Sequence, residues 1–172
     1  MEKGYVQVYT GNGKGKTTAA LGLSLRAVCA GKKVFFGQFI KGMDYSELKA
    51  MDLLPNFTLE QFGKDCFIYN EPTEEDVKIA QEGLERIKDV LRDGQYDIVV
   101  LDEINVSIYF KLFTSQEVIQ AISNRAPHVE VICTGRYAPP ELIEYADLVT
   151  EMKLIKHYYE TQGVQARVGI EK

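Results

Sequence analysis

The sequence predicts a three-layer α/β domain in which helices cover both faces of a mostly parallel β-sheet. Short apolar runs alternate with segments of helical character along the chain, which is the order that parallel sheets require. The apolar runs lack the polar alternation of a strand with one face in water, so both faces of the sheet are expected to be buried. At 172 residues the chain has the length of one ordinary domain, and we expect one domain over residues 1–172.

The N-terminal part begins with a short β-type run at residues 6–9, which leads directly into a glycine-rich stretch at residues 11–18. Residues 19–30 are rich in alanine and leucine and are followed by Gly31, a pattern that predicts a helix and its end. The run KVFFGQF predicts a second strand at residues 33–39.

The middle of the chain contains the clearest predicted helix, residues 73–93. Thr73 can cap it, and the three acidic residues that follow suit the positive end of a helix dipole. Before this helix, residues 46–54 predict a short helix stopped by Pro55, and residues 57–62 predict a strand. The apolar residues of the long helix recur at helical spacing and define one buried face: Val77, Ala80, Leu84, Ile87 and Leu91.

The C-terminal half predicts two buried strands, at residues 97–101 (DIVVL) and 129–133 (VEVIC), with a helix between them at residues 115–123. A short helix is expected at residues 139–145, which open with two prolines, and a last strand at residues 148–155.

Polar clusters follow three of the expected strands, at residues 10–18, 102–103 and 134–136. Ligands of parallel sheets bind where the strands end, because the carboxyl ends of the strands meet at one edge. We therefore expect the three clusters to form a single site.

The first cluster resembles a phosphate-binding P-loop, since Gly15, Lys16 and Thr17 lie between a strand and a helix. Glycines let backbone N–H groups turn toward phosphate oxygens, the helix N-terminus attracts anions, and the lysine adds a cation. The Thr17 hydroxyl is the expected magnesium ligand. Thr10 stands where the general pattern has glycine, so Gly11 and Gly13 are expected to carry the turn.

The other two clusters supply an acidic pair and an arginine. Asp102 and Glu103 follow a buried strand as a Walker B element does, and such carboxylates hold magnesium directly or through water. Glu103 is alternatively the base that activates water, which would make the chain an NTPase. Arg136 suits a phosphate because its planar fork donates two hydrogen bonds. Arg26 would by position alone be a solvated helix residue.

The composition excludes several classes of protein. Twenty Lys and Arg stand against 25 Asp and Glu, a net charge of −5, which argues against broad binding to a nucleic-acid backbone. No signal segment and no run of about 18 apolar residues occurs, so we expect no membrane span and a cytoplasmic setting. Cys29, Cys66 and Cys133 form no CxxC pair, and they are expected to be small buried hydrophobes rather than zinc ligands or disulfide partners.

Seven segments together resemble the P-loop corrinoid adenosyltransferases. The TGNGKGKTT loop is much more specific than a general P-loop, and Thr10 belongs to that family's version of it. The segments occur in the family's order: residues 8–20 (VYTGNGKGKTTAA), 38–42 (QFIKG), 99–104 (VVLDEI), 133–136 (CTGR), 146–152 (ADLVTEM), 156–157 (KH) and 169–171 (GIE).

The resemblance implies a RecA-like P-loop NTPase fold, a homodimer, and transfer of the 5′-deoxyadenosyl group of ATP to a Co(I) corrinoid such as cob(I)alamin, with release of triphosphate. It implies Mg²⁺, with Mn²⁺ as an alternative, and a reductase or flavoprotein that supplies electrons to cobalt. Co(I) is a strong nucleophile without a proton to lose, so the reaction needs no general base. Stabilising the departing triphosphate is the main task of the site.

The resemblance also implies the site residues. Lys16, Thr17 and Glu103 are the expected catalytic residues, and Thr17, Glu103 and Asp102 the expected metal ligands. Some relatives place a Phe and a Trp beneath the corrin, and the resemblance implies that Phe67 and Tyr69 fill these roles in this chain. Some relatives also have an N-terminal extension that covers the site, and here this cover is expected to be missing or replaced. The expected contacts to ATP or corrinoid are Thr10, Gly11, Asn12, Gly13, Lys14, Gly15, Lys16, Thr17, Thr18, Arg26, Arg136, Phe67 and Tyr69.

Two alternatives remain at this point. A P-loop ATPase or kinase would use Glu103 as base and release ADP, and a nucleotide-dependent switch would turn over slowly. The product formed from ATP and a reduced corrinoid separates the three.

Overall fold

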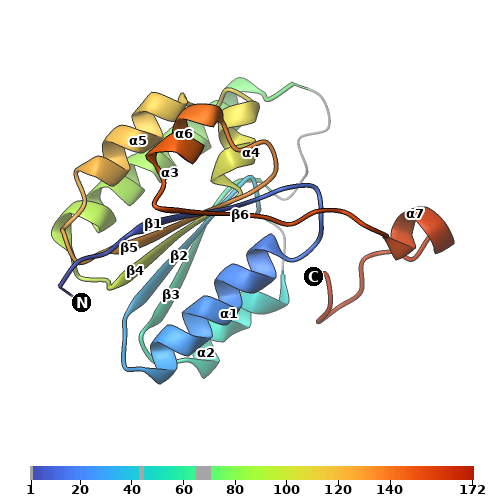
Figure 1. Cartoon of the computed structure of the whole chain (residues 1–172), viewed down its shortest axis with the longest axis horizontal. Coiled ribbons are helices and arrows are strands. Elements are labelled where there is room, and N and C mark those ends of the chain that lie inside the picture. The colour runs from blue at the N-terminus through green and yellow to red at the C-terminus, as the bar shows by residue number, and fades with distance from the viewer. Residues whose placement is uncertain (1, 43–44, 65–70) are drawn as a thin grey trace.

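The computed structural model describes residues 2–42, 45–64 and 71–172. These ranges contain one six-stranded sheet with the strand order β3-β2-β4-β5-β1-β6, in which every neighbouring pair is parallel (Figure 1). The predicted parallel sheet is thus confirmed. The strands are β1 (Val6–Thr10), β2 (Val34–Phe39), β3 (Phe57–Phe62), β4 (Ile98–Asp102), β5 (Glu130–Thr134) and β6 (Leu148–Glu151).

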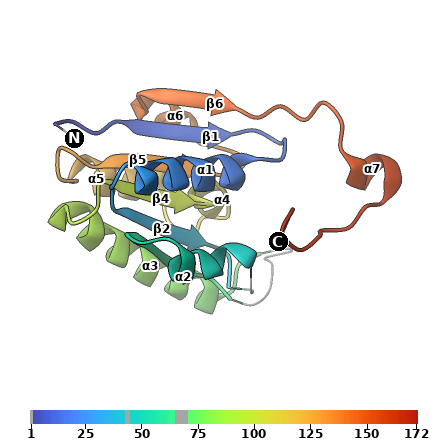
Figure 2. The ribbon, with the colours of Figure 1, turned by 90° about the horizontal axis from the view of Figure 1, so that it is seen from below.

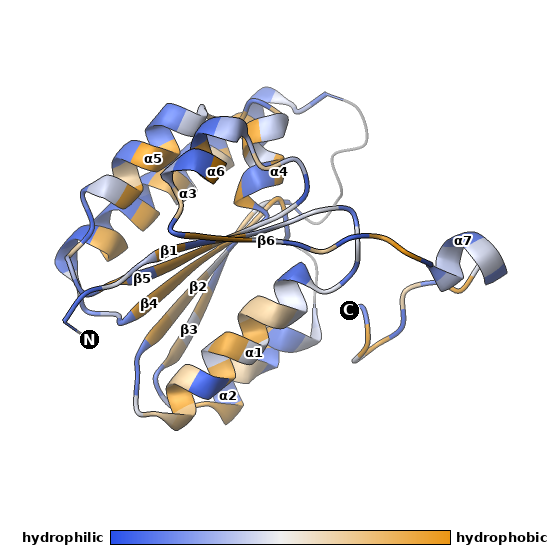
Figure 3. Cartoon of the chain, viewed as in Figure 1, coloured by the Kyte–Doolittle hydropathy of each residue, from blue (hydrophilic) through white to orange (hydrophobic). Residues whose placement is uncertain are grey.

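Helices cover both faces of the sheet, as the alternating pattern predicts. Figure 2 shows α1 and α2 on one face, and Figure 1 shows α3, α5 and α6 on the other. The strands are mostly apolar, and the helices on both faces carry apolar and polar residues (Figure 3). Buried apolar residues form two clusters, one on each side of the sheet. The helices are α1 (Lys16–Cys29), the 3₁₀ turn η1 (Ser46–Lys49), α2 (Ala50–Leu53), α3 (Glu74–Asp93), α4 (Ile104–Tyr109), α5 (Ser115–Ser123), α6 (Pro140–Tyr145) and α7 (Tyr158–Gln162).

The long helix α3 follows the predicted pattern closely. Thr73 caps it and forms a capping box with Asp76, and Gly94 ends it in the left-handed conformation at φ 66°. Its predicted apolar face is buried, with Val77 partly so. In the described ranges, no helix combines the length and the apolarity that crossing a membrane requires.

Several predicted boundaries differ from the structure. Residues 46–54 form η1 followed by α2 instead of one helix, and the predicted last strand ends at Glu151. This strand is the outer edge of the sheet, where a single neighbour, β1, holds it. The short helices α4 and α7 were not predicted.

The cysteine prediction is wrong for Cys29 and correct for Cys133. Cys133 is fully buried in β5, whereas Cys29 is exposed at the end of α1. The buried residues of α1 include Ala20, Ser24 and Ala27, and Cys29 lies on another side of the helix. Cys66 lies outside the described residues.

Candidate functional site

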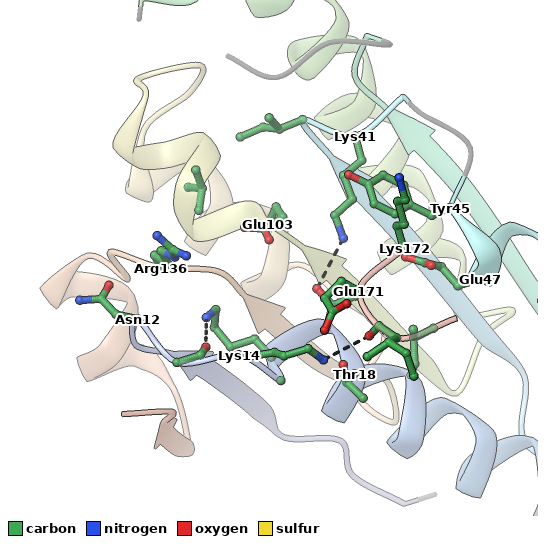
Figure 4. Close-up of a pocket in the computed structure, with 18 of the residues that line it drawn as sticks. Asn12, Lys14, Thr18, Lys41, Tyr45, Glu47, Glu103, Arg136, Glu171 and Lys172 are labelled. Atoms are coloured by element: carbon green, nitrogen blue, oxygen red, sulfur yellow. Dashed lines mark hydrogen bonds between the residues drawn. The ribbon is translucent and has the colours of Figure 1, made fainter. Parts of the chain in front are cut away.

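The three predicted polar clusters meet at one edge of the sheet. Strands β4, β5 and β1 are neighbours, and their carboxyl ends carry Asp102, Thr134 and the glycine-rich loop. A cavity of about 810 Å³ opens there (Figure 4). Its lining includes Asn12, Gly13, Lys14, Gly15, Lys16, Thr17 and Thr18 from the loop and α1, together with Lys41, Tyr45, Glu103, Phe110, Arg136, Tyr137 and His157.

The glycine-rich loop packs against the chain that follows β6. The Gly13 N–H donates to the Met152 carbonyl at 2.7 Å. Gly11 has a φ of 95°, and a Cβ there would lie 2.5 Å from the Met152 oxygen. Gly15, at φ 121°, precedes the first residue of α1. Glycine is therefore required at positions 11 and 15 by conformation and at position 11 by space as well.

Lys16 is held against its own loop. Its ammonium donates to the carbonyl oxygens of Gly11 at 2.7 Å and Gly13 at 2.8 Å. Burial lowers the pKa of Lys16, Glu103 opposes this shift, and Arg136 adds to it. The loop thus presents a partly desolvated cation to the cavity, where its attraction for an anion is stronger than in bulk water.

Asp102 is the centre of a buried hydrogen-bond network. Its Oδ1 accepts from the hydroxyls of Thr134 at 2.6 Å and Thr17 at 2.8 Å. Its Oδ2 accepts from the Lys41 ammonium at 2.8 Å and the Gln38 amide at 3.4 Å. Asp102 is 0% exposed, and four donors satisfy the four positions at which a carboxylate accepts.

Glu103, the next residue, is in a different situation. Its backbone adopts the left-handed conformation at φ 61°, between the end of β4 and the start of α4. Within the described ranges no hydrogen bond to its carboxylate is found, although the carboxylate lines the cavity. Burial, and then the charge of Asp102, raise the pKa of Glu103, while Lys41, Lys16 and Arg136 lower it.

The donors at this edge fit a magnesium ion. Thr17 and Glu103 both line the cavity and offer a hydroxyl and a carboxylate, the oxygen ligands that Mg²⁺ prefers. Glu103 is the carboxylate with acceptor positions to spare, whereas those of Asp102 are taken. The fit is therefore best for Thr17 and Glu103 as direct ligands. Asp102 would orient Thr17 by accepting a hydrogen bond from its hydroxyl.

Arg136 reaches the cavity from the turn after β5. Gly135 allows this turn with a φ of 127°, and the amide of the buried Asn105 donates to the Gly135 carbonyl at 2.9 Å. A Cβ at Gly135 would lie 3.2 Å from Oε2 of Glu103. The turn therefore brings the guanidinium to the same cavity as the acidic residue.

The structure brings most of the predicted binding residues together, but not all. Thr10 ends β1, and its hydroxyl accepts from the Ala138 N–H at 3.4 Å. Arg26 is exposed in the last turn of α1, and ten residues of helix separate it from Lys16 by about 15 Å. Phe67 and Tyr69 lie outside the described residues.

Three features of the cavity were missed by sequence reasoning. Lys41 pairs with Asp102 although 61 positions separate them. Tyr137 stacks on Tyr109 with ring centroids 4.3 Å apart. No local sequence pattern predicts this contact, because the two residues are far apart in the chain. Residues 169–172 also line the cavity, and the Lys14 ammonium donates to the Ile170 carbonyl at 3.2 Å.

Comparisons with known proteins agree on one family. The family described as "ATP:corrinoid adenosyltransferase BtuR/CobO/CobP" matches residues 2–171. The chain is 37% identical over 171 residues to the corrinoid adenosyltransferase of Escherichia coli K12, a match that covers 99% of this chain and 86% of the relative. It is 36% identical over 181 residues to that of a Sinorhizobium species, covering 99% and 81%, and 35% identical over 179 residues to that of Salmonella typhimurium, covering 99% and 86%.

Proposed function

Since the chain belongs to the ATP:corrinoid adenosyltransferase family, we propose that its cavity holds Mg-ATP with the ribose C5′ facing the cobalt of a reduced corrinoid. The chain is a transferase that adenosylates corrinoids, with ATP as the adenosyl donor. The observation that carries the assignment of the site is the meeting of Lys16, Glu103 and Arg136 in one cavity at the carboxyl edge of the sheet.

The reaction is an in-line displacement at C5′. The Co(I) electron pair forms the cobalt–carbon bond, the C5′–O bond breaks, and its electron pair leaves on the triphosphate. No proton moves from the nucleophile, so Glu103 is not needed as a base. The Lys16 ammonium, the Arg136 guanidinium and the loop N–H groups stabilise the charge that develops on the leaving oxygen, and preorganised groups of this kind are worth about 2–4 kcal/mol each.

We propose that Thr17 and Glu103 hold Mg²⁺, or Mn²⁺ in its place. When bound, the ion neutralises phosphate charge and orients the triphosphate. The carboxylate of Glu103 supports this role, because it is partly buried, accepts no hydrogen bond from the described residues, and would be stabilised by a cation.

Aromatic and apolar side chains are proposed to hold the large ring system. Tyr137 and Phe110 line the cavity beside Arg136, and they offer flat apolar surfaces against which a base or a corrin edge packs. The proposed contacts of Phe67 and Tyr69 below the corrin, and that of Arg26 with nucleotide, stay predictions.

Three further proposals concern the setting of the enzyme. A homodimer is proposed, and the exposed edge strand β6 with Leu148 and Val149 at its surface supports it. A cytoplasmic location is proposed, because Cys29 and Cys133 are free thiols. A one-electron donor such as a flavoprotein reductase is proposed, since Co(I) must be made from Co(II).

The test of the proposed function is the product. The protein is incubated with Mg-ATP and chemically reduced cobalamin, and triphosphate and the cobalt–carbon chromophore are measured together. Equal amounts of both are expected. Orthophosphate or ADP without a cobalt–carbon bond would instead assign hydrolysis or phosphoryl transfer, and ATP binding without any turnover would assign a switch.

A further inference from the structure

Lys41 and Asp102 form an ion pair at the edge of the cavity, and we propose that Lys41 is a second triphosphate-binding cation that Asp102 positions. This inference rests on the proposed function, because it assigns to Lys41 a contact with the leaving group of the same reaction. It also assigns to Asp102 the task of orienting Lys41 and Thr17.

The direction of Lys41 is set by an unusual backbone conformation. Lys41 lies two residues after the end of β2, and the residue between them, Ile40, has a φ of 63°. A β-branched residue rarely adopts this conformation, and it persists where the surroundings enforce it. The Ile40 N–H donates to the Phe62 carbonyl at 3.2 Å, so β3 holds the turn that aims Lys41 toward the end of β4.

The ammonium of Lys41 lies between the phosphate loop and the acidic strand end. It is 2.8 Å from Oδ2 of Asp102 and 3.5 Å from Oγ1 of Thr17, while the Tyr45 ring lies 5.2 Å away. An ammonium has three protons to donate, and its bonds to the described residues use two. Lys41 itself lines the cavity, where the third proton is available to a ligand oxygen.

The ion pair of Lys41 and Asp102 costs free energy of folding, which is consistent with a role in function. The Lys41 side chain is 13% exposed and that of Asp102 is fully buried, and burying two charges removes hydration that their mutual attraction repays only in part. Burial lowers the pKa of Lys41, but the charge and hydrogen bond of Asp102, together with the charges of Glu103 and Glu47, raise the pKa above the ordinary value. The ammonium therefore stays charged at the cavity.

The position of Lys41 complements the other cations. Lys14 and Lys41 point into the cavity from opposite sides in Figure 4, and Lys16 and Arg136 line it as well. A triphosphate carries charge along its whole length, so one lysine cannot neutralise it. Lys41 supplies a cation on the β2 side, next to the Thr17 hydroxyl that is proposed to hold the metal.

The experiment measures binding of inorganic tripolyphosphate with Mg²⁺ by calorimetry, together with kcat and KM for corrinoid adenosylation. Lys41→Met is expected to weaken tripolyphosphate binding at least tenfold and to lower kcat, while Lys41→Arg keeps most of the binding. Lys32→Met is the matched control, because Lys32 pairs with Asp97 at 3.4 Å at the opposite end of the same two strands. It is expected to stay within twofold of the unchanged protein.

The role of Asp102 is tested by combining substitutions. Asp102→Asn is expected to weaken tripolyphosphate binding, and Lys41→Met added to it is expected to cost much less than Lys41→Met alone. Full additivity would overturn the positioning role. Binding of tripolyphosphate by folded Lys41→Met within twofold of the unchanged protein would overturn the proposal for Lys41.

A measurement on the unchanged protein covers the case in which Lys41→Met does not fold. Acetylation rates are measured by mass spectrometry, and tripolyphosphate is expected to slow the modification of Lys41 and not of Lys32. Equal rates at Lys41 with and without tripolyphosphate would overturn the proposal. Failure of the unchanged protein to form a cobalt–carbon bond would instead count against the proposed function, independently of these results.

Discussion

The hydroxyl of Thr17 donates to Oδ1 of Asp102 at 2.8 Å, and this bond joins the first turn of α1 to the last residue of β4. Thr17→Ala removes one of the four donors to a buried carboxylate and is expected to lower the free energy of unfolding by about 1 kcal/mol. It also removes a proposed metal ligand, so adenosylation is expected to fall at least tenfold. Thr17→Ser keeps the oxygen and should retain most of the activity in the same kinetic assay. Equal rates for the Ala and Ser variants would contradict the role of the hydroxyl.

Lys16→Ala is expected to abolish activity while the fold survives. The lysine makes its two hydrogen bonds to carbonyl oxygens of its own loop, so its removal leaves the sheet intact. Each lost hydrogen bond costs about 1 kcal/mol, whereas loss of a preorganised cation costs at least a hundredfold in rate. Circular dichroism and kcat are measured together. A near-normal rate would refute the P-loop assignment.

Two glycines of the same region are expected to respond in opposite ways to alanine. Gly11→Ala places a Cβ 2.5 Å from the Met152 carbonyl at a φ of 95° and is expected to destabilise the protein by more than about 1 kcal/mol. Gly22 lies inside α1 with nothing within 4 Å of an added Cβ, so Gly22→Ala is expected to stabilise by about 0.5–1 kcal/mol. Thermal unfolding measures both, and a shift of the same sign for the two would show that the loop geometry is misassigned.

The two described cysteines are expected to differ strongly in reactivity. Burial raises the pKa of the Cys133 thiol to about 12, whereas Cys29 is exposed. In a Cys66→Ser background at pH 8, Cys29 is expected to react with a disulfide reagent within minutes, and Cys133 only after unfolding, because the thiolate is the reactive form. The Cys29→Ser/Cys66→Ser protein is the control. Rapid reaction of its remaining thiol without denaturant would contradict the burial of β5.

Glu117 is expected to make the stability of α5 depend on pH. Its carboxylate accepts from the Thr114 N–H at 2.7 Å and from the Thr114 hydroxyl at 2.8 Å, and these bonds, the backbone one foremost, lower the pKa of Glu117. A carboxyl group with a lowered folded-state pKa stabilises the fold above its unfolded-state pKa, and this stability is lost as the pH falls through the folded-state pKa.

Glu117→Gln is therefore expected to lower Tm at pH 7 by about 1–2 °C, which corresponds to about 0.5 kcal/mol. The difference should vanish at a pH below the folded-state pKa of Glu117. Glu82→Gln is the control, because among the described residues Glu82 makes a single long ion pair, with Lys78 at 3.9 Å on an exposed helix face. A Tm difference for Glu117→Gln that persists in acid would exclude the charge as its cause.

The sequence predicted those parts of the fold and site that depend on neighbouring residues. The phosphate loop, the acidic strand end and the helix α3 are contiguous patterns, and the structure contains all three. The pairing of Lys41 with Asp102 depends on the adjacency of β2 and β4, which no local pattern encodes. Helix α4 escaped prediction because its N-cap, Glu103, gives no side-chain capping bond and its six residues are too few for a periodic signal.

The wrong expectation for Cys29 has a physical reason. It rested on the average burial of cysteine and not on the phase of its helix. Gly22, Leu25 and Cys29 follow helical spacing and are all exposed, while Ala20, Ser24 and Ala27 face the sheet. The side of α1 on which a residue lies determines whether that residue is buried, and the average burial of cysteine does not change this.

The position of β1 in the sheet also determines when the site can form during synthesis. The strand is made before its two neighbours, β5 and β6, which come much later in the sequence. The loop that follows β1 is held partly by a hydrogen bond from Gly13 to the Met152 carbonyl, and Met152 is translated after β6. Pairings this distant in sequence form slowly. The phosphate loop is translated before β5 and β6 and is therefore expected to be among the last segments to reach its native conformation.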